Sequence, residues 1–178
     1  FLNLMGADIH REQDGSVVIN GVDNLKNKVE FDVIPDRIEA GTFMIAVAMC
    51  GGDVILKDVE PKHLSIVTNK LIDAGADIDI EPKQLRVRMD KRPKSIDMST
   101  AIYPGFPTDL QAQWMALMTI AEGSCTVTDT IYTDRFTHIA ELERLGAKIH
   151  LDNNVAHITG VKKLYGAQVM STDIRASA

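Results

Sequence analysis

At 178 residues the chain is long enough to bury the core of one or two domains, and its 45% of hydrophobic residues are ordinary for a globular protein. Its formal net charge of -6 argues against a broad basic surface for nucleic acid or for an anionic membrane. No apolar run approaches the ~20 residues of a membrane span and the first residues lack a signal-peptide pattern, so we expect a soluble, cytoplasmic protein with no nucleic-acid or membrane partner.

The first half of the chain predicts a hairpin followed by alternating strands and helices. Strands are expected near Ile9 and Val17, joined by a turn at Asp14-Gly15. Between residues 32 and 89, hydrophobic periodicity predicts the order strand, helix, strand, helix and two hairpin strands. The expected bounds are 32–34, 36–49, 53–59, 64–72, 76–80 and 85–89, with helix ends at Gly51-Gly52 and Gly75.

The second half repeats that order. Its helices and strands are expected over residues 110–121, 125–131, 139–145, 148–151 and 155–159, with a hairpin turn at Asn153-Asn154. Strands linked through a helix favour parallel pairing, whereas a hairpin is antiparallel, so each unit is predicted to be a mixed sheet with helices on one face. Several units could bury their helices together. The predicted fold class is therefore α/β (α+β), built from repeated βαβαββ units.

Two short markers recur at equivalent points of these units. A Leu-x-x-x-Gly-Ala string occurs three times, about seventy residues apart. A Pro or Thr followed by Asp opens helices in PDRIEAG, TDLQAQW and TDIRASA. The equivalent residues are Gly6, Gly75 and Gly146 for the first marker, and Asp36, Asp109 and Asp173 for the second. A repeated scaffold by itself is also compatible with a noncatalytic binding module.

Asp109 has a structural interpretation and a chemical one. Structurally, Pro107 breaks the preceding segment, and Thr108 with Gln111 fits the capping-box pattern T-x-x-Q. An aspartate in the first turn also complements the helix dipole. Chemically, a carboxylate held rigidly at a helix start can serve as a general base. The pattern alone favours the structural interpretation.

The cysteines and histidines predict no metal site. Cys50 and Cys125 lie in apolar patterns without C-x-x-C spacing, so both are expected to be buried free thiols. His138 and His150 have no partner at ligand spacing and are interpreted as surface or satisfied polar residues. Arg37, at a helix start, is assigned a structural role.

Four strings carry a resemblance to a known family. FDVIPDRIEAGTF, YPGFPTDLQAQWMAL, TDRFTHIAELERLGAKI and GAQVMSTDIRASA, in this order, resemble the UDP-N-acetylglucosamine 1-carboxyvinyltransferases, enolpyruvyl transferases of peptidoglycan synthesis. The resemblance implies two inside-out α/β barrels, each made of three βαβαββ units with the helices inside. It assigns residues 1–30 to the end of the preceding domain. Residues 31–178 would form two complete units and the start of a third in the C-terminal domain.

The resemblance also implies a reaction. The enolpyruvyl group of phosphoenolpyruvate moves to the 3-hydroxyl of UDP-N-acetylglucosamine with release of phosphate, and neither a metal nor an organic cofactor is implied. The alternative is an enzyme like 5-enolpyruvylshikimate-3-phosphate synthase, although FPTDLQAQ favours the UDP-sugar enzyme. The family's mobile catalytic loop and its Lys-Asn pair have no counterpart here. We therefore expect an inactive fragment whose partners include the remainder of its own polypeptide.

By the same resemblance, five residues belong to the active site. Asp109 matches the proposed general base that contacts the sugar 3-hydroxyl. Asp173 matches a residue implicated in proton transfer, and Arg175 one that contacts the enolpyruvyl carboxylate. Arg135 is expected to face the cleft and to position the substrate or the Asp109 carboxylate. Ile131 is expected to contact the UDP-sugar through its backbone, although the pattern alone makes it the buried end of a strand.

Overall fold

The computed structural model describes residues 1–171, which fall into two compact units with their boundary between residues 34 and 35. The first unit contains two antiparallel strands, β1 (Asp8–Arg11) and β2 (Val17–Asn20), with Ile9 opposite Ile19. The predicted strands near Ile9 and Val17 are confirmed. Gly15, in the turn that joins them, has a φ of 88°, a conformation that glycine adopts without steric cost.

The second unit opens with two helices and a three-stranded sheet. The sheet has the order β3-β5-β4, and both neighbouring pairs are antiparallel. Both predicted helices and three of the four predicted strands are present. They are α1 (Arg37–Cys50), β3 (Gly52–Lys57), α2 (Ser65–Asp73), β4 (Asp77–Glu81) and β5 (Gln84–Met89), with a 3₁₀ turn, η1 (Pro61–Leu64), before α2.

The predicted strand at residues 32–34 is wrong for this structure, and so is the mixed sheet predicted for this half. Residues 32–34 form no strand, and Val33 is 85% exposed. A strand needs a hydrogen-bonding neighbour, and β3 lies at the edge of its sheet, paired with β5 alone among the described strands. Because none of the strands described within residues 1–171 joins the other side of β3, both pairs in this sheet are antiparallel.

The other half contains the complete predicted order. Its sheet runs β6-β7-β9-β8, with β6 parallel to β7 and the remaining pairs antiparallel, so the predicted mixed sheet is confirmed here. Apart from the extra strand β6, the strand order matches that of the first half. The elements are β6 (Met98–Ser99), η2 (Thr108–Leu110), α3 (Gln111–Thr119), β7 (Ser124–Thr128), α4 (Ile139–Arg144), β8 (Lys148–Asp152) and β9 (Val155–Thr159).

The Leu-x-x-x-Gly-Ala marker corresponds to one repeated backbone motif. Gly75 and Gly146 follow α2 and α4 with φ of 107° and 94°. In each copy the alanine after the glycine donates its N–H to the leucine carbonyl five residues earlier, at 2.9 Å for Ala76 and 3.1 Å for Ala147. Such bonds satisfy the last carbonyls of a helix. Gly6, with a φ of 97°, and Ala7, bonded to the Leu2 carbonyl at 3.1 Å, repeat the motif in the first unit.

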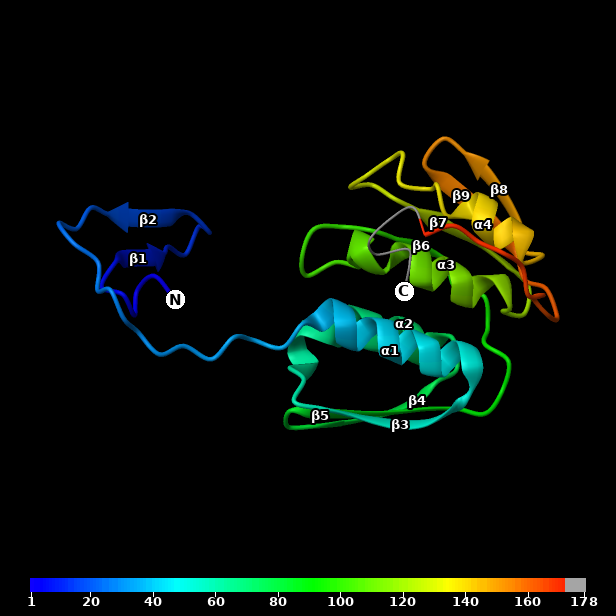
Figure 1. The fold of residues 1–178 in the computed structure, drawn as a ribbon, viewed down its shortest axis with the longest axis horizontal. Coiled ribbons are helices and arrows are strands. Elements are labelled where there is room, and N and C mark those ends of the chain that lie inside the picture. The colour runs from blue at the N-terminus through cyan, green and yellow to red at the C-terminus, as the bar shows by residue number, and fades with distance from the viewer. Residues whose placement is uncertain (172–178) are drawn as a thin grey trace. The chain divides into compact units, whose positions relative to one another are not determined.

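Figure 1 shows that α1, α2 and α3 lie between the two sheets of the second unit. Buried residues therefore occur on more than one side of α1, among them Ile45 on one side and Val47 on the other. Helix packing is close where α1 crosses η2, because a Cβ on Gly41 would lie 2.5 Å from the Leu110 side chain. These three helices form the inside of the unit, in agreement with the prediction that the units bury their helices together.

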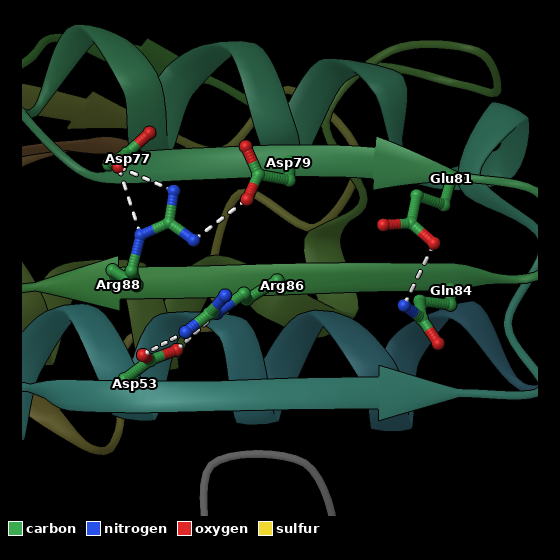
Figure 2. A network of polar contacts seen from close by, with 7 residues as sticks. All are labelled: Asp53, Asp77, Asp79, Glu81, Gln84, Arg86 and Arg88. Carbon is green, nitrogen blue, oxygen red and sulfur yellow. Dashed lines mark hydrogen bonds and ion pairs between the residues drawn. The ribbon is translucent and has the colours of Figure 1, made fainter.

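The outer face of the first sheet carries a charged network (Figure 2). Arg86 donates to both carboxylate oxygens of Asp53, at 2.8 and 2.6 Å, and Arg88 bridges Asp77 and Asp79. The hydrogen bond from Arg86 lowers the pKa of Asp53. The three carboxylates are solvent-exposed, so their ion pairs contribute little to stability. The network marks this face of the sheet as the outside of the unit.

The two cysteines differ in burial. Cys125 is buried in β7, as predicted, and burial raises the pKa of its thiol to about 11. Cys50 is exposed, so its predicted burial is wrong. It is the last residue of α1, where the helix leaves the core for Gly51.

Candidate active site

The start of α3 differs from the predicted capping box. Neither Pro107, which precedes η2, nor Leu110, which precedes α3, caps with a side chain, and the Thr108 hydroxyl instead donates to Asp129 at 2.6 Å. The Gln111 amide donates to the Arg135 carbonyl at 3.4 Å. The capping-box prediction is therefore wrong, because both side chains that would form it bond to the segment that follows β7.

Asp36 and Asp109 occupy equivalent sequence positions but make different contacts. Asp36 caps α1, and its Oδ1 accepts from the backbone N–H groups of Ile38 at 2.7 Å and Glu39 at 3.3 Å. The carboxylate of Asp109 instead pairs with the guanidinium of Arg135. The repeat thus uses one aspartate for helix capping and the other for an ion pair.

The Asp109–Arg135 ion pair is the centre of the candidate site. Arg135 Nη1 lies 2.9 Å from Asp109 Oδ1, and the two side chains are 21% and 38% exposed respectively. The Arg135 guanidinium also lies 5.9 Å from the centroid of the Tyr132 ring. A charge-assisted bond of this length orients both groups while part of the carboxylate remains accessible to solvent.

Asp129 connects the segments around this pair. Its Oδ1 accepts from the Thr100 hydroxyl at 2.7 Å and from the N–H groups of Ile131 and Tyr132 at 2.9 Å each, and its Oδ2 accepts from Thr108 at 2.6 Å. Asp129 is fully buried, and no cationic side chain is paired with it among the described residues. An ionised carboxylate offers enough acceptor sites for all four donors. Sequence reasoning missed this residue because it placed residue 129 inside a strand, whereas β7 ends at Thr128.

The pKa of Asp129 reflects two opposing influences. Burial raises it, but the hydrogen bonds from Thr108, Tyr132, Thr100 and Ile131 together lower it below its ordinary value. The carboxylate is therefore held in its ionised form by neutral donors.

We expect the Asp129→Asn substitution to destabilise the fold in a pH-dependent way. A lowered folded-state pKa contributes stability above the ordinary pKa of 3.8 and loses it as the pH falls through the folded value. The difference in free energy of unfolding between wild type and variant should therefore be largest above about pH 5 and should shrink toward about pH 2. Urea titrations at several pH values measure it. A difference independent of pH would contradict the assignment of an ionised Asp129.

Ile131 and Arg135 lie in the segment that follows β7. Ile131 is 37% exposed, so its interpretation as the buried end of a strand is wrong. Its backbone N–H is bonded to Asp129, which fixes the backbone at this position. The structure thus brings Asp109 and Arg135 together and places Ile131 on the same segment as Arg135. Asp173 and Arg175 lie outside the described residues.

Three other residues were assigned roles outside the site. Arg37 lies with its guanidinium 5.2 Å from the centroid of the Tyr103 ring. His138 is buried with Nε2 3.3 Å from the sulfur of Met115, which agrees with a satisfied polar residue. His150 stacks on His157 at 6.3 Å.

Within residues 1–171 there is neither a candidate metal site nor a candidate membrane-spanning helix. Their His, Cys, Asp and Glu side chains form no cluster of three or more that could hold a metal ion. None of the helices in this range combines the length and the apolar composition required to cross a bilayer.

Sequence comparison confirms the resemblance noted from the motifs. UDP-N-acetylglucosamine 1-carboxyvinyltransferase from Thermodesulfovibrio yellowstonii is 47% identical over 178 residues, which cover 100% of this chain and 43% of that protein. The chain therefore spans less than half the length of this relative.

Solved structures share the fold. The enolpyruvyl transferase NikO from Streptomyces tendae matches with a TM-score of 0.84 and 23% identity over 98% of this chain and 42% of that one. EPSP synthase from Acinetobacter baumannii matches with a TM-score of 0.73 and 21% identity over 99% of this chain and 44% of that one. The predicted enolpyruvyl transferase fold is confirmed. Because the model of the EPSP synthase (3-phosphoshikimate 1-carboxyvinyltransferase) family matches residues 1–178, the chain belongs to that family of carboxyvinyltransferases.

Proposed function

We propose that the chain is part of a longer enzyme that transfers the enolpyruvyl group of phosphoenolpyruvate to the 3-hydroxyl of UDP-N-acetylglucosamine, in the cytoplasm. The similarity to UDP-N-acetylglucosamine 1-carboxyvinyltransferase over the whole chain supports the choice of acceptor. In this proposal residues 1–30 end the preceding domain, and residues 31–178 contribute two units and the start of a third to the C-terminal domain.

The observation that carries the proposal is the Asp109–Arg135 pair. A carboxylate needed only to start the helix would bond to backbone N–H groups, as Asp36 does. Asp109 is instead oriented by the guanidinium 2.9 Å away. Orientation by a second group is a common property of general bases.

In the proposed mechanism Asp109 accepts the proton of the sugar 3-hydroxyl while that oxygen bonds to C2 of phosphoenolpyruvate and C3 receives a proton. Removal of a proton from C3 then expels phosphate and restores the double bond. Arg135 holds the Asp109 carboxylate in place, and the backbone at Ile131 contacts the UDP-sugar. Asp173, in proton transfer, and Arg175, at the enolpyruvyl carboxylate, complete this half of the site in the proposal.

An assay of phosphate release tests the function. The full-length enzyme should release phosphate from phosphoenolpyruvate with UDP-N-acetylglucosamine as acceptor. Residues 1–178 alone should release none, because effective molarities of about 10⁵ M or more require both reactants to be positioned together. Full activity of the isolated chain would contradict the proposal that the site is shared with other segments.

A second candidate is transfer to 3-phosphoshikimate, which the name of the matching family favours. Supplying 3-phosphoshikimate in place of the UDP-sugar separates the two. Phosphate release with 3-phosphoshikimate alone would replace the first proposal by this one.

A further inference from the structure

We propose that Asp129 is a positioning residue that builds the Asp109–Arg135 pair, a role whose catalytic importance rests on the function proposed above. Its carboxylate accepts hydrogen bonds both from the segment that contains Asp109 and from the segment that contains Arg135. On one side, Oδ2 accepts from Thr108, the residue directly before Asp109. On the other, Oδ1 accepts from the N–H of Tyr132, whose ring flanks the Arg135 guanidinium at 5.9 Å.

The segments joined in this way are distant in sequence. Thr108 begins η2, Tyr132 follows β7, and Thr100 follows β6, and all three donate to the one carboxylate. Further bonds tie Asp129 to its surroundings. Its N–H donates to the Asn154 carbonyl at 3.1 Å, and its own carbonyl accepts from the Asn154 amide at 2.9 Å. The backbone of Asp129 is thus fixed to the hairpin of β8 and β9, and its carboxylate bonds from that fixed position to Thr108 and to the N–H of Tyr132.

The cost of this arrangement argues for a specific role. Burying an ionised carboxylate without a cation is expensive, and an apolar residue in the same place would avoid that cost. Four hydrogen bonds offset the cost. Three of them come from Thr108, Ile131 and Tyr132, in the segments that contain Asp109 and Arg135. Catalytic groups must be held within a fraction of an ångström by the residues behind them.

The Thr108→Val substitution tests the connection to Asp109, since valine has nearly the shape of threonine without its hydroxyl. Thr126→Val is a matched control on β7, because the Thr126 hydroxyl donates to a different aspartate, Asp97, at 3.0 Å. Thr108→Ser restores the hydroxyl. The first readout is ¹⁵N NMR of this chain. The Nη signals of Arg135 are identified as those absent from the Arg135→Lys variant, and the exchange between them measures the rate at which the guanidinium rotates.

Thr108→Val should speed rotation of the Arg135 guanidinium at least about 10-fold. Thr126→Val should leave the rate unchanged, and Thr108→Ser should have the wild-type rate. The three variants should have similar thermal stability. Unchanged rotation in Thr108→Val, or equal changes in both valine variants, would overturn the proposal. Asp129→Asn is the second variant and should have the same effect if Thr108→Val fails to fold. This readout needs no activity, so its failure is distinct from a failure of the proposed function.

Kinetics of the full-length enzyme give the second readout. Thr108→Val should lower kcat about 10-fold to 10²-fold, with little change in KM, because a misplaced base affects the chemical step more than binding. Thr108→Ser should recover kcat, and Thr126→Val should leave it unchanged. Equal kcat values for the two valine variants would show that Asp129 acts only on folding.

Discussion

The Asp109→Asn substitution should lower kcat of the full-length enzyme by roughly 10² to 10⁴, the usual contribution of a general base. Asparagine matches aspartate in shape but cannot accept the proton. The N-cap residues of η2 and α3 are Pro107 and Leu110, and neither makes a side-chain cap, so Asp109 does not occupy the N-cap position of either element. Steady-state phosphate release measures the effect.

Asp36→Asn is the matched control for that experiment. Asp36 occupies the equivalent position in the repeat and caps α1, and asparagine caps a helix as well as aspartate does. It should therefore leave kcat unchanged. Near wild-type turnover in Asp109→Asn would show that Asp109 is not the base, whereas equal losses in both variants would point to damage to the fold.

The Trp114→Ala substitution should reduce the free energy of unfolding by about 3 to 5 kcal/mol, the usual range for removing a buried aromatic side chain. Trp114 is fully buried in α3 and packs edge-to-face on Phe106 with ring centroids 5.5 Å apart. Because Trp114 is the one tryptophan of the chain, unfolding in urea should be followed by circular dichroism.

Phe43→Ala provides the comparison for Trp114, since Phe43 lies on α1 and is 54% exposed. It should cost well under half as much in free energy of unfolding as Trp114→Ala. Similar costs for the two substitutions would contradict the placement of the core between the helices and the sheets.

Local sequence signals predicted much of the fold. The helices and the hairpin strands were predicted because each has its own periodicity and because a glycine with positive φ ends α2 and α4. The strand at residues 32–34 was not predictable in this way, since a strand forms only beside a partner. The sequence could show an apolar run at Val33 and Ile34 but not whether a neighbouring edge was present to pair with it.

The candidate site was less accessible to sequence reasoning. The repeat placed Asp36 and Asp109 at equivalent positions, yet their side chains bond differently. Asp36 accepts from backbone N–H groups, whereas Asp109 pairs with Arg135, which comes from a segment distant in sequence. Asp129 was missed for a related reason. Its role depends on contacts with residues 21 and 29 positions away, which local periodicity does not show. A buried acid within a Thr-rich strand pattern is the signal that could have been noticed.

The most direct test of the proposed function is a crystal structure of the full-length enzyme with UDP-N-acetylglucosamine bound, in which the distance from the Asp109 carboxylate to the sugar 3-hydroxyl oxygen is measured. The account predicts a hydrogen bond of about 2.6 to 3.2 Å, with Arg135 still paired with Asp109. A 3-hydroxyl more than about 5 Å from Asp109, beyond hydrogen-bonding reach even through a single bridging water, would contradict it.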